Sequence, residues 1–288
     1  MITYNPKNWI KLIFAFHKSD TLRMLWKEML YIFFLTLAID YIVMRYFPNA
    51  RQFDNLLTVY SIIGFVISLL LVFRTNTAYD RWWEGRRKWG ELVNDSRNFG
   101  SKLSVILKDE EDRAFFKRMI PNFPFACKDH LRTGAIISNL DLTPEEFKII
   151  SSKKHIPLAI VQLMQQKLYI LNRNGQITNE DYKRLDTNLN NFLNSLGACE
   201  RIKATPIPFS YSLFIKKFIV IYVSTIPLAF ISIFGYWSAI IATFIFYILV
   251  SMELLAEEIE DPFGPDDNDL PTDELSDKIK GNIEELFG

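Results

Sequence analysis

The chain has 288 residues, of which 49% are hydrophobic and 15% aromatic, and its 33 basic and 33 acidic side chains give a formal net charge of zero. That balance argues against nucleic acid as a partner, and the two cysteines are too few for a disulfide framework. Long apolar stretches lie near both ends of the chain, and most of the charge lies between them. This separation is typical of a membrane protein with a large water-exposed part.

Four apolar stretches approach the roughly 20 residues that a helix needs to cross a bilayer. They cover about residues 29–47, 56–73, 214–234 and 236–255. The second contains no charged residue, which favours membrane spans over the alternative, core helices of a large soluble protein. Gly235 separates the third stretch from the fourth, so we expect a tight helical hairpin there. Asp40 interrupts the first stretch and is a candidate for either a functional or a structural role.

Basic residues beside these stretches predict their orientation. Five lie within residues 7–27, five within 74–88 and four within 201–217. The loop between the first two stretches holds only Arg51, and the turn between the last two holds none. We therefore expect a multi-pass protein of the cell membrane, with both termini and the charged middle region in the cytoplasm.

The middle region is predicted to be helical, because apolar residues recur in it at three- and four-residue spacing. Thr143 and Thr178 each precede acids in the manner of helix N-caps, and the segment Thr205-Pro206-Ile207-Pro208 ends the region. The predicted organisation has five parts: an N-terminal segment (1–28), two spans (29–73), a cytoplasmic helical domain (74–213), two spans (214–255) and an acidic C-terminal segment (256–288).

Enzymatic chemistry has no support in the sequence. There is no glycine-rich phosphate loop and no His/Cys cluster at metal-binding spacing, and the three histidines, His17, His130 and His155, are far apart in sequence. We expect no enzyme and no required cofactor. Two segments stand out instead: a Trp- and Arg-rich segment after the second stretch, in which the alternation of acids and bases suggests buried ion pairs, and an acidic segment after the fourth.

Three motifs resemble the bestrophin family, in its order and at its spacing across nearly the whole chain. They are FRTNTAYDRWWEGRRKWGELV (73–93), CERIKATPIPFSY (199–211) and LAEEIEDPFGPDDNDLP (255–271). The resemblance, closest to the bacterial members, implies an all-α, four-span protein with a large helical cytoplasmic domain. It also implies a homopentamer around one central ion pathway, with membrane lipids and permeating monovalent ions as the other partners.

In bestrophins the second span lines a narrow apolar neck. The positions that match this neck are Thr58, Ile62 and Val66, which are spaced four apart on one helix face. A neighbouring face is the alternative register, with Ser61, Phe65 and Ser68, and a helix-packing face is a second alternative. The family's cytoplasmic aperture matches Ile177 and Glu180. The calcium site of animal bestrophins matches Glu258, Asp261, Asp266 and Asp269, although Asp261 and Pro265 depart from the animal pattern. Calcium is thus an optional ligand.

The resemblance favours a channel for monovalent cations, sodium or potassium, because the short chain matches the bacterial type. A chloride or other anion channel, calcium-dependent as in animals, is the first alternative. A non-conducting membrane transporter or scaffold is the second.

Overall fold

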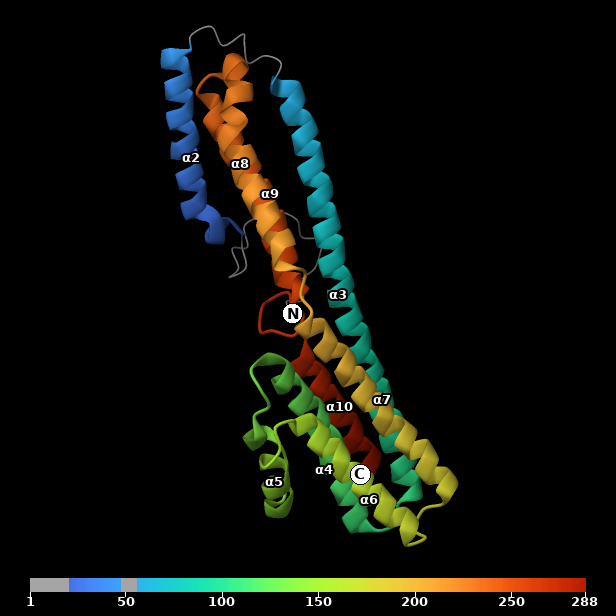
Figure 1. Ribbon diagram of the computed structural model, residues 1–288. Coiled ribbons are helices and arrows are strands. Elements are labelled where there is room, and N and C mark those ends of the chain that lie inside the picture. The colour runs from blue at the N-terminus through green and yellow to red at the C-terminus, as the bar shows by residue number, and fades with distance from the viewer. Residues whose placement is uncertain (1–20, 48–55) are drawn as a thin grey trace. The chain divides into compact units, whose positions relative to one another are not determined.

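The computed structural model describes residues 21–47 and 56–288, and all regular secondary structure in these ranges is helical (Figure 1). The all-α prediction is therefore confirmed. The chain divides into two compact units. The first, here called the membrane unit, holds the described residues up to Arg81 together with Pro206–Glu260 and Asp266–Asn268. The second, the polar unit, holds Trp82–Thr205, Asp261–Pro265 and Asp269–Gly288.

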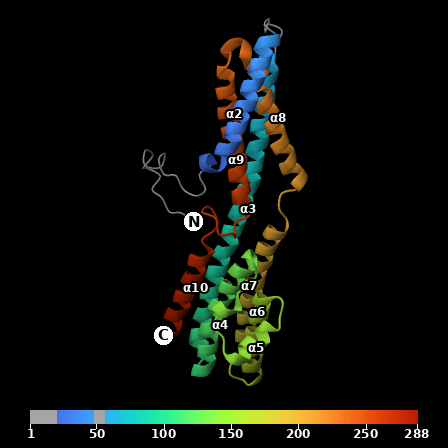
Figure 2. The same cartoon turned by 90° about the vertical axis from the view of Figure 1, so that its left-hand side faces the viewer.

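The membrane unit contains four helices that are long and apolar enough to cross a membrane, which agrees with the four predicted spans. They are α2 (Thr21–Tyr46), the first part of α3 (Leu56–Ile106), α8 (Phe209–Phe234) and α9 (Trp237–Glu260). Helices α2, α8 and α9 pack against one another (Figures 1 and 2). Gly235 has a φ of 53°, which favours glycine, and it forms the expected tight turn between α8 and α9.

Aliphatic and aromatic side chains form the core of this unit, among them Ile32, Ile67, Ile219, Val223 and Phe246. Many other apolar side chains of the same helices point outward and are exposed. An apolar exterior around helices whose backbone bonds are internally satisfied suits lipid or other protein chains rather than water.

Helix α3 continues without a break from Leu56 to Ile106. Its residues up to Arg81 belong to the membrane unit, and those from Trp82 onward belong to the polar unit. The predicted domain boundary at residues 73 and 74 thus falls inside one continuous helix.

The polar unit also contains α4 (Glu110–Arg132), the short helices η2 (Ile137–Asn139) and α5 (Pro144–Ser151), α6 (Ile156–Arg173), α7 (Asn179–Ala204) and α10 (Thr272–Phe287). Helix α4 packs against α6, α7 and α10, around a core that includes Phe99, Phe116, Phe123 and Phe192. Both predicted N-caps are present: Thr143 accepts from the Glu146 N–H, and Thr178 from the Asp181 N–H.

Candidate ion pathway and buried charge cluster

The membrane part of α3 has one buried face and one exposed face. Ile67, Leu71, Arg74 and Ala78 are buried, at the spacing that places residues on one side of a helix. The predicted neck residues all lie on the exposed side; they are Thr58, Ile62 and Val66. The subunit itself therefore leaves this ladder free to face a pore, another subunit or lipid. The neck stays a prediction.

The neighbouring face of α3, the alternative register, is exposed as well; it carries Ser61, Phe65 and Ser68. The Ser61 hydroxyl donates to the Leu57 carbonyl oxygen at 2.8 Å, and the Ser68 hydroxyl to that of Gly64 at 2.9 Å. Hydroxyls bonded to their own helix need no other partner in an apolar setting. Because residues 56–73 carry no charge, both registers would give uncharged rings.

The side chain of Tyr222, on α8, reaches α3 at Gly64. A Cβ atom at position 64 would lie 2.6 Å from the Tyr222 hydroxyl oxygen, so the Tyr222 side chain would have to shift to make room for it. Tyr222 donates this hydroxyl to the Tyr60 carbonyl oxygen at 3.3 Å, and the two tyrosine rings lie 5.7 Å apart. Gly64 thus leaves room for the Tyr222 ring against this part of α3.

A buried charge cluster joins α3 to α9 directly after the apolar residues 56–73 of α3. Arg74 is 1% exposed; its Nη2 lies 2.6 Å from Oε2 of Glu260, and its Nε lies 3.5 Å from Oε2 of Glu253. The two acids are seven residues apart on α9 and so share one face of that helix. The other Glu260 oxygen accepts the Ile207 N–H at 2.5 Å, in the Pro-rich break before α8. Arg81 Nε donates to the Glu260 carbonyl oxygen at 3.1 Å.

This cluster places two carboxylates against one guanidinium. Isolated buried charges are costly, and removing one partner of a buried pair typically costs about 3–5 kcal/mol. The cluster therefore fixes the register of α3 against α9 and against the start of α8. It also concentrates acidic groups at this end of the membrane unit.

Arg74 and Glu84 of the Trp- and Arg-rich segment form ion pairs with residues of other helices. Asp80 and Arg87 are exposed, and Glu84 pairs with Arg201 of α7 at 2.5 Å on the surface of the polar unit. The fully buried base is Arg74, whose partners come from α9. The expected buried pairing thus holds for Arg74, the first base of the segment, with partners on α9. It does not hold for Asp80 and Arg87, which are exposed.

Asp40 has a structural position in the membrane unit. It is fully buried, and Ser238 of α9 lies 2.6 Å from both of its carboxylate oxygens. The contact with Ser238 ties α2 to α9 and agrees with the structural role considered for Asp40.

The predicted calcium ligands occupy different environments. Glu258, in the last turns of α9, is partly buried, and Asn268 donates to it from both its side chain and its backbone N–H. Asp261 and Asp266 are exposed, whereas Asp269 is buried, with a carboxylate oxygen close to Gly264. Glu258 and Asp266 belong to the membrane unit and Asp261 and Asp269 to the polar unit, so the four-residue site stays a prediction.

The two predicted aperture residues, Ile177 and Glu180, differ in how far they are exposed. Ile177 is 4% exposed and lies in the hydrophobic core of the polar unit. Glu180, in the first turn of α7, is exposed and pairs with Arg184 at 3.5 Å. A side chain buried in its own subunit presents little surface to a pore, so Glu180 is the better placed of the two. The aperture itself stays a prediction.

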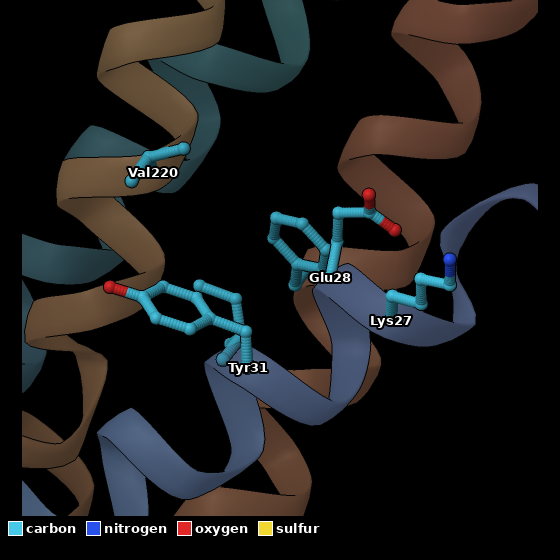
Figure 3. A pocket seen from close by; sticks show the side chains of 6 residues that line it. Lys27, Glu28, Tyr31 and Val220 are labelled. Carbon is cyan, nitrogen blue, oxygen red and sulfur yellow. The ribbon is translucent and has the colours of Figure 1, made fainter.

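A hollow of about 290 Å³ opens between α2, α8 and α9 (Figure 3). Tyr31 extends from α2 toward Val220 of α8, and Lys27 and Glu28 lie along α2 beside it. Ile32 and Phe246 complete the lining. An apolar floor with a charged rim is a surface that lipid can cover.

Two groupings of side chains were not predicted from the sequence. Arg74 stands directly after an uncharged stretch, and acids seven apart on α9 were a readable signal for its partners. The second grouping brings together histidines that are far apart in sequence: His130 and His155 both lie against Glu200. No motif joins these three residues, because 25 residues or more separate any two of them along the chain.

The sequence is similar to a family model and to known proteins over most of its length. A family model described as bacterial/fungal bestrophin protein matches residues 1–285. The chain is 32% identical over 285 residues to the voltage-dependent anion channel-forming protein YneE of Salmonella typhi, covering 97% of this chain and 92% of that protein. It is 36% identical over 233 residues to the voltage-dependent anion channel-forming protein alr2987 of Nostoc sp., covering 77% and 74% of the two chains.

Solved structures of similar fold point to the same family. The structure resembles a crystal structure of a bacterial bestrophin homologue from Klebsiella pneumoniae, with a TM-score of 0.79, 26% identity, and 91% and 99% of the two chains covered. Another crystal structure, described as a membrane protein, gives a TM-score of 0.83 at 25% identity, covering 92% of this chain and 98% of that one.

Proposed function

The chain belongs to the bacterial and fungal bestrophin family, and on that premise we propose that it forms a homopentameric ion channel in the cell inner membrane. The observation that carries the proposal is the membrane part of α3, an uncharged helix whose exposed face the subunit does not cover. The names of the relatives, which describe channel-forming proteins, support the same function.

In this proposal five α3 helices surround a central axis. Thr58, Ile62 and Val66 would then form one polar and two aliphatic rings. Narrow aliphatic rings can gate a pore by dewetting, without any charged gate. The buried contacts of Arg74 and Gly64 would hold each α3 at a fixed rotation, so that the same residues face the axis in every subunit.

The orientation in the membrane follows from the flanking charge. Lysines and arginines are concentrated before α2, after the apolar part of α3 and before α8. Such residues favour the cytoplasmic side. Both termini and the polar unit would therefore lie in the cytoplasm, with membrane lipids around the apolar exterior.

Monovalent cations, sodium or potassium, are the proposed permeant ions. The support is the resemblance to bacterial bestrophins. Glu180 would contribute to such a preference less than an isolated acid, because Arg184 lies beside it. Anion conduction is the second candidate, and the names of the relatives favour it.

Calcium is a further proposal for the acidic segment after α9. Carboxylates on a turn suit a cation that takes six to eight oxygen ligands, and Glu258, Asp261, Asp266 and Asp269 would supply them. Treatment of the purified protein with a calcium chelator tests this. A fall in thermal stability or a change in current supports the site, and unchanged values for both reject it.

The mass of the purified protein in detergent separates a channel from a transporter or scaffold. Native mass spectrometry of the full chain should give a mass five times that of one subunit. A stable monomer would contradict a shared central pore. Flux of sodium into vesicles that contain the pentamer would then test conduction itself.

A further inference from the structure

Two histidines and one glutamate converge in the polar unit. His130 lies in the last turn of α4, His155 is the N-cap of α6, and Glu200 lies near the end of α7. Nε2 of His130 is 2.8 Å and Nε2 of His155 is 2.9 Å from the same oxygen, Oε1 of Glu200. The imidazole ring centroids are 4.6 Å apart. Three helices of the unit thus meet at one small polar cluster.

We propose that this cluster, which we call the His–His–Glu site, binds a divalent first-row transition-metal ion such as Zn²⁺. The atoms that each residue offers all lie within 4.8 Å of one another, so small side-chain rotations suffice to place an ion between them. The proposal concerns the polar unit alone and does not depend on conduction of ions by the protein.

The donor set selects the class of ion. Zinc takes imidazole nitrogen and carboxylate oxygen in tetrahedral sites, and three protein ligands leave a fourth position for water. Two imidazoles with one carboxylate also suit other first-row ions. Calcium and magnesium prefer oxygen ligands throughout, so two imidazoles disfavour them.

The site is open enough to exchange an ion. The side chains of His130, His155 and Glu200 are 27%, 37% and 35% exposed. An ion can therefore enter from solvent, whereas the surrounding helices limit how far the ligands can move apart. Among the described residues, this is the one group of three or more such side chains close enough to hold a metal ion.

Nearby thiols do not compete for the ion. Cys127 lies one turn before His130 on α4, and Cys199 precedes Glu200 on α7; both are buried. Burial raises the pKa of Cys127 well above its ordinary value and that of Cys199 to about 12. Both thiols belong to the buried hydrophobic core of the polar unit, whereas the three proposed ligands are partly exposed.

The contacts of both imidazoles with Glu200 must change when the ion binds. Nδ1 of His155 accepts the Leu158 N–H at 3.2 Å, so in the neutral ring the proton lies on Nε2 and is donated to Glu200. To bind the ion, Nε2 of His155 must use its lone pair, so its proton is released to solvent. The ion would replace the hydrogen bonds that both imidazoles make with Glu200, and it would link α4, α6 and α7 directly.

The test uses the full chain in detergent, stripped with a chelator and dialysed against Zn²⁺, with bound zinc counted by elemental analysis. We expect about one zinc per chain. His130→Gln, His155→Asn and Glu200→Gln should each weaken binding at least tenfold; Asn is chosen at position 155 because it is a good N-cap. His17→Ala is the matched control, since His17 is the remaining histidine, and it should bind as the parent does.

Cobalt provides a readout that needs no variant. Co²⁺ added to the stripped parent protein should give the visible absorption of a four- or five-coordinate ion with nitrogen and oxygen ligands. The proposal would be overturned if the parent bound no stoichiometric zinc, or if all three site variants bound zinc as tightly as the parent. A loss of binding in His17→Ala as large as in the site variants would also overturn it. Near-ultraviolet thiolate-to-cobalt absorption would also overturn it, because it would place the ion on Cys127 or Cys199.

Discussion

Arg74 and Glu260 lie 186 residues apart in the chain, yet Nη2 of the first is 2.6 Å from Oε2 of the second, and both are buried. Glu253 adds a second carboxylate on the same face of α9. The pair sets the position of α3, the helix whose exposed face is the proposed lining of the ion pathway.

Replacing Arg74 by Met should destabilise the protein by about 3–5 kcal/mol, because two buried carboxylates lose their base. The midpoint of thermal unfolding in detergent measures this. Arg87→Met is the matched control, since Arg87 is exposed on the same helix, and its midpoint should stay close to that of the parent. Equal midpoints for the two variants would contradict the role of the cluster.

Gly64→Ala should destabilise the membrane unit, because the new Cβ would lie 2.6 Å from the Tyr222 hydroxyl oxygen. In the background of Tyr222→Phe, which lacks this oxygen, the same change should cost less. We expect a coupling of about 0.5–3 kcal/mol between the two positions. Gly197→Ala is the control: nothing lies within 4 Å of its Cβ position in α7, and alanine there should be neutral or stabilising. Additive effects at 64 and 222 would refute the close approach.

Asp273 should make the polar unit sensitive to acid. Burial alone would raise its pKa, but hydrogen bonds from Arg132 and Lys128 outweigh this effect and lower the pKa to about 2. A lowered pKa stabilises the fold above the unfolded value, about 3.9, and this contribution is lost as the pH falls toward 2. Because the side chain is 55% exposed, we expect at most about 1 kcal/mol.

Thermal unfolding of Asp273→Asn between about pH 4 and pH 2 checks this contribution. The variant should be less stable than the parent at pH 6 and should lose part of the parent's acid dependence. Glu274→Gln, in the same turn and also exposed, should keep it. An Asp273→Asn profile parallel to that of the parent would show that the ion pairs contribute nothing.

Much of the fold could be predicted from the sequence. The four membrane-crossing helices follow from uncharged stretches of the right length, and the helix starts at Thr143 and Thr178 follow from local capping chemistry. These features depend on residues close together in the chain. The continuous course of α3 was not predicted, because charge rises sharply after residue 73 although helix propensity does not change there.

The candidate sites were less predictable. Periodicity placed Thr58, Ile62 and Val66 on one helix face, but it could not tell a pore face from a packing face. Ile177 shows the difficulty: the resemblance to bestrophins suggested that it lines an aperture, yet it is buried in the core of the polar unit. Arg74 with Glu260, and His130 with Glu200, depend on how distant helices pack, which no spacing rule supplies.

Ile62→Ala should raise the single-channel current, because a smaller side chain widens an aliphatic constriction and eases its wetting. Phe65→Ala, on the neighbouring face, is the matched comparison. A larger effect at Phe65 would shift the lining to the alternative register. An unchanged current in Ile62→Ala would reject Ile62 as a constriction.

The most direct test of the central claim is the current carried by the purified full chain in a planar bilayer with asymmetric sodium chloride. We predict discrete ion currents whose reversal potential lies toward the equilibrium potential of sodium. A reversal potential toward that of chloride would replace the cation proposal by the anion one. The absence of current from a protein shown to be inserted and pentameric would contradict the channel itself.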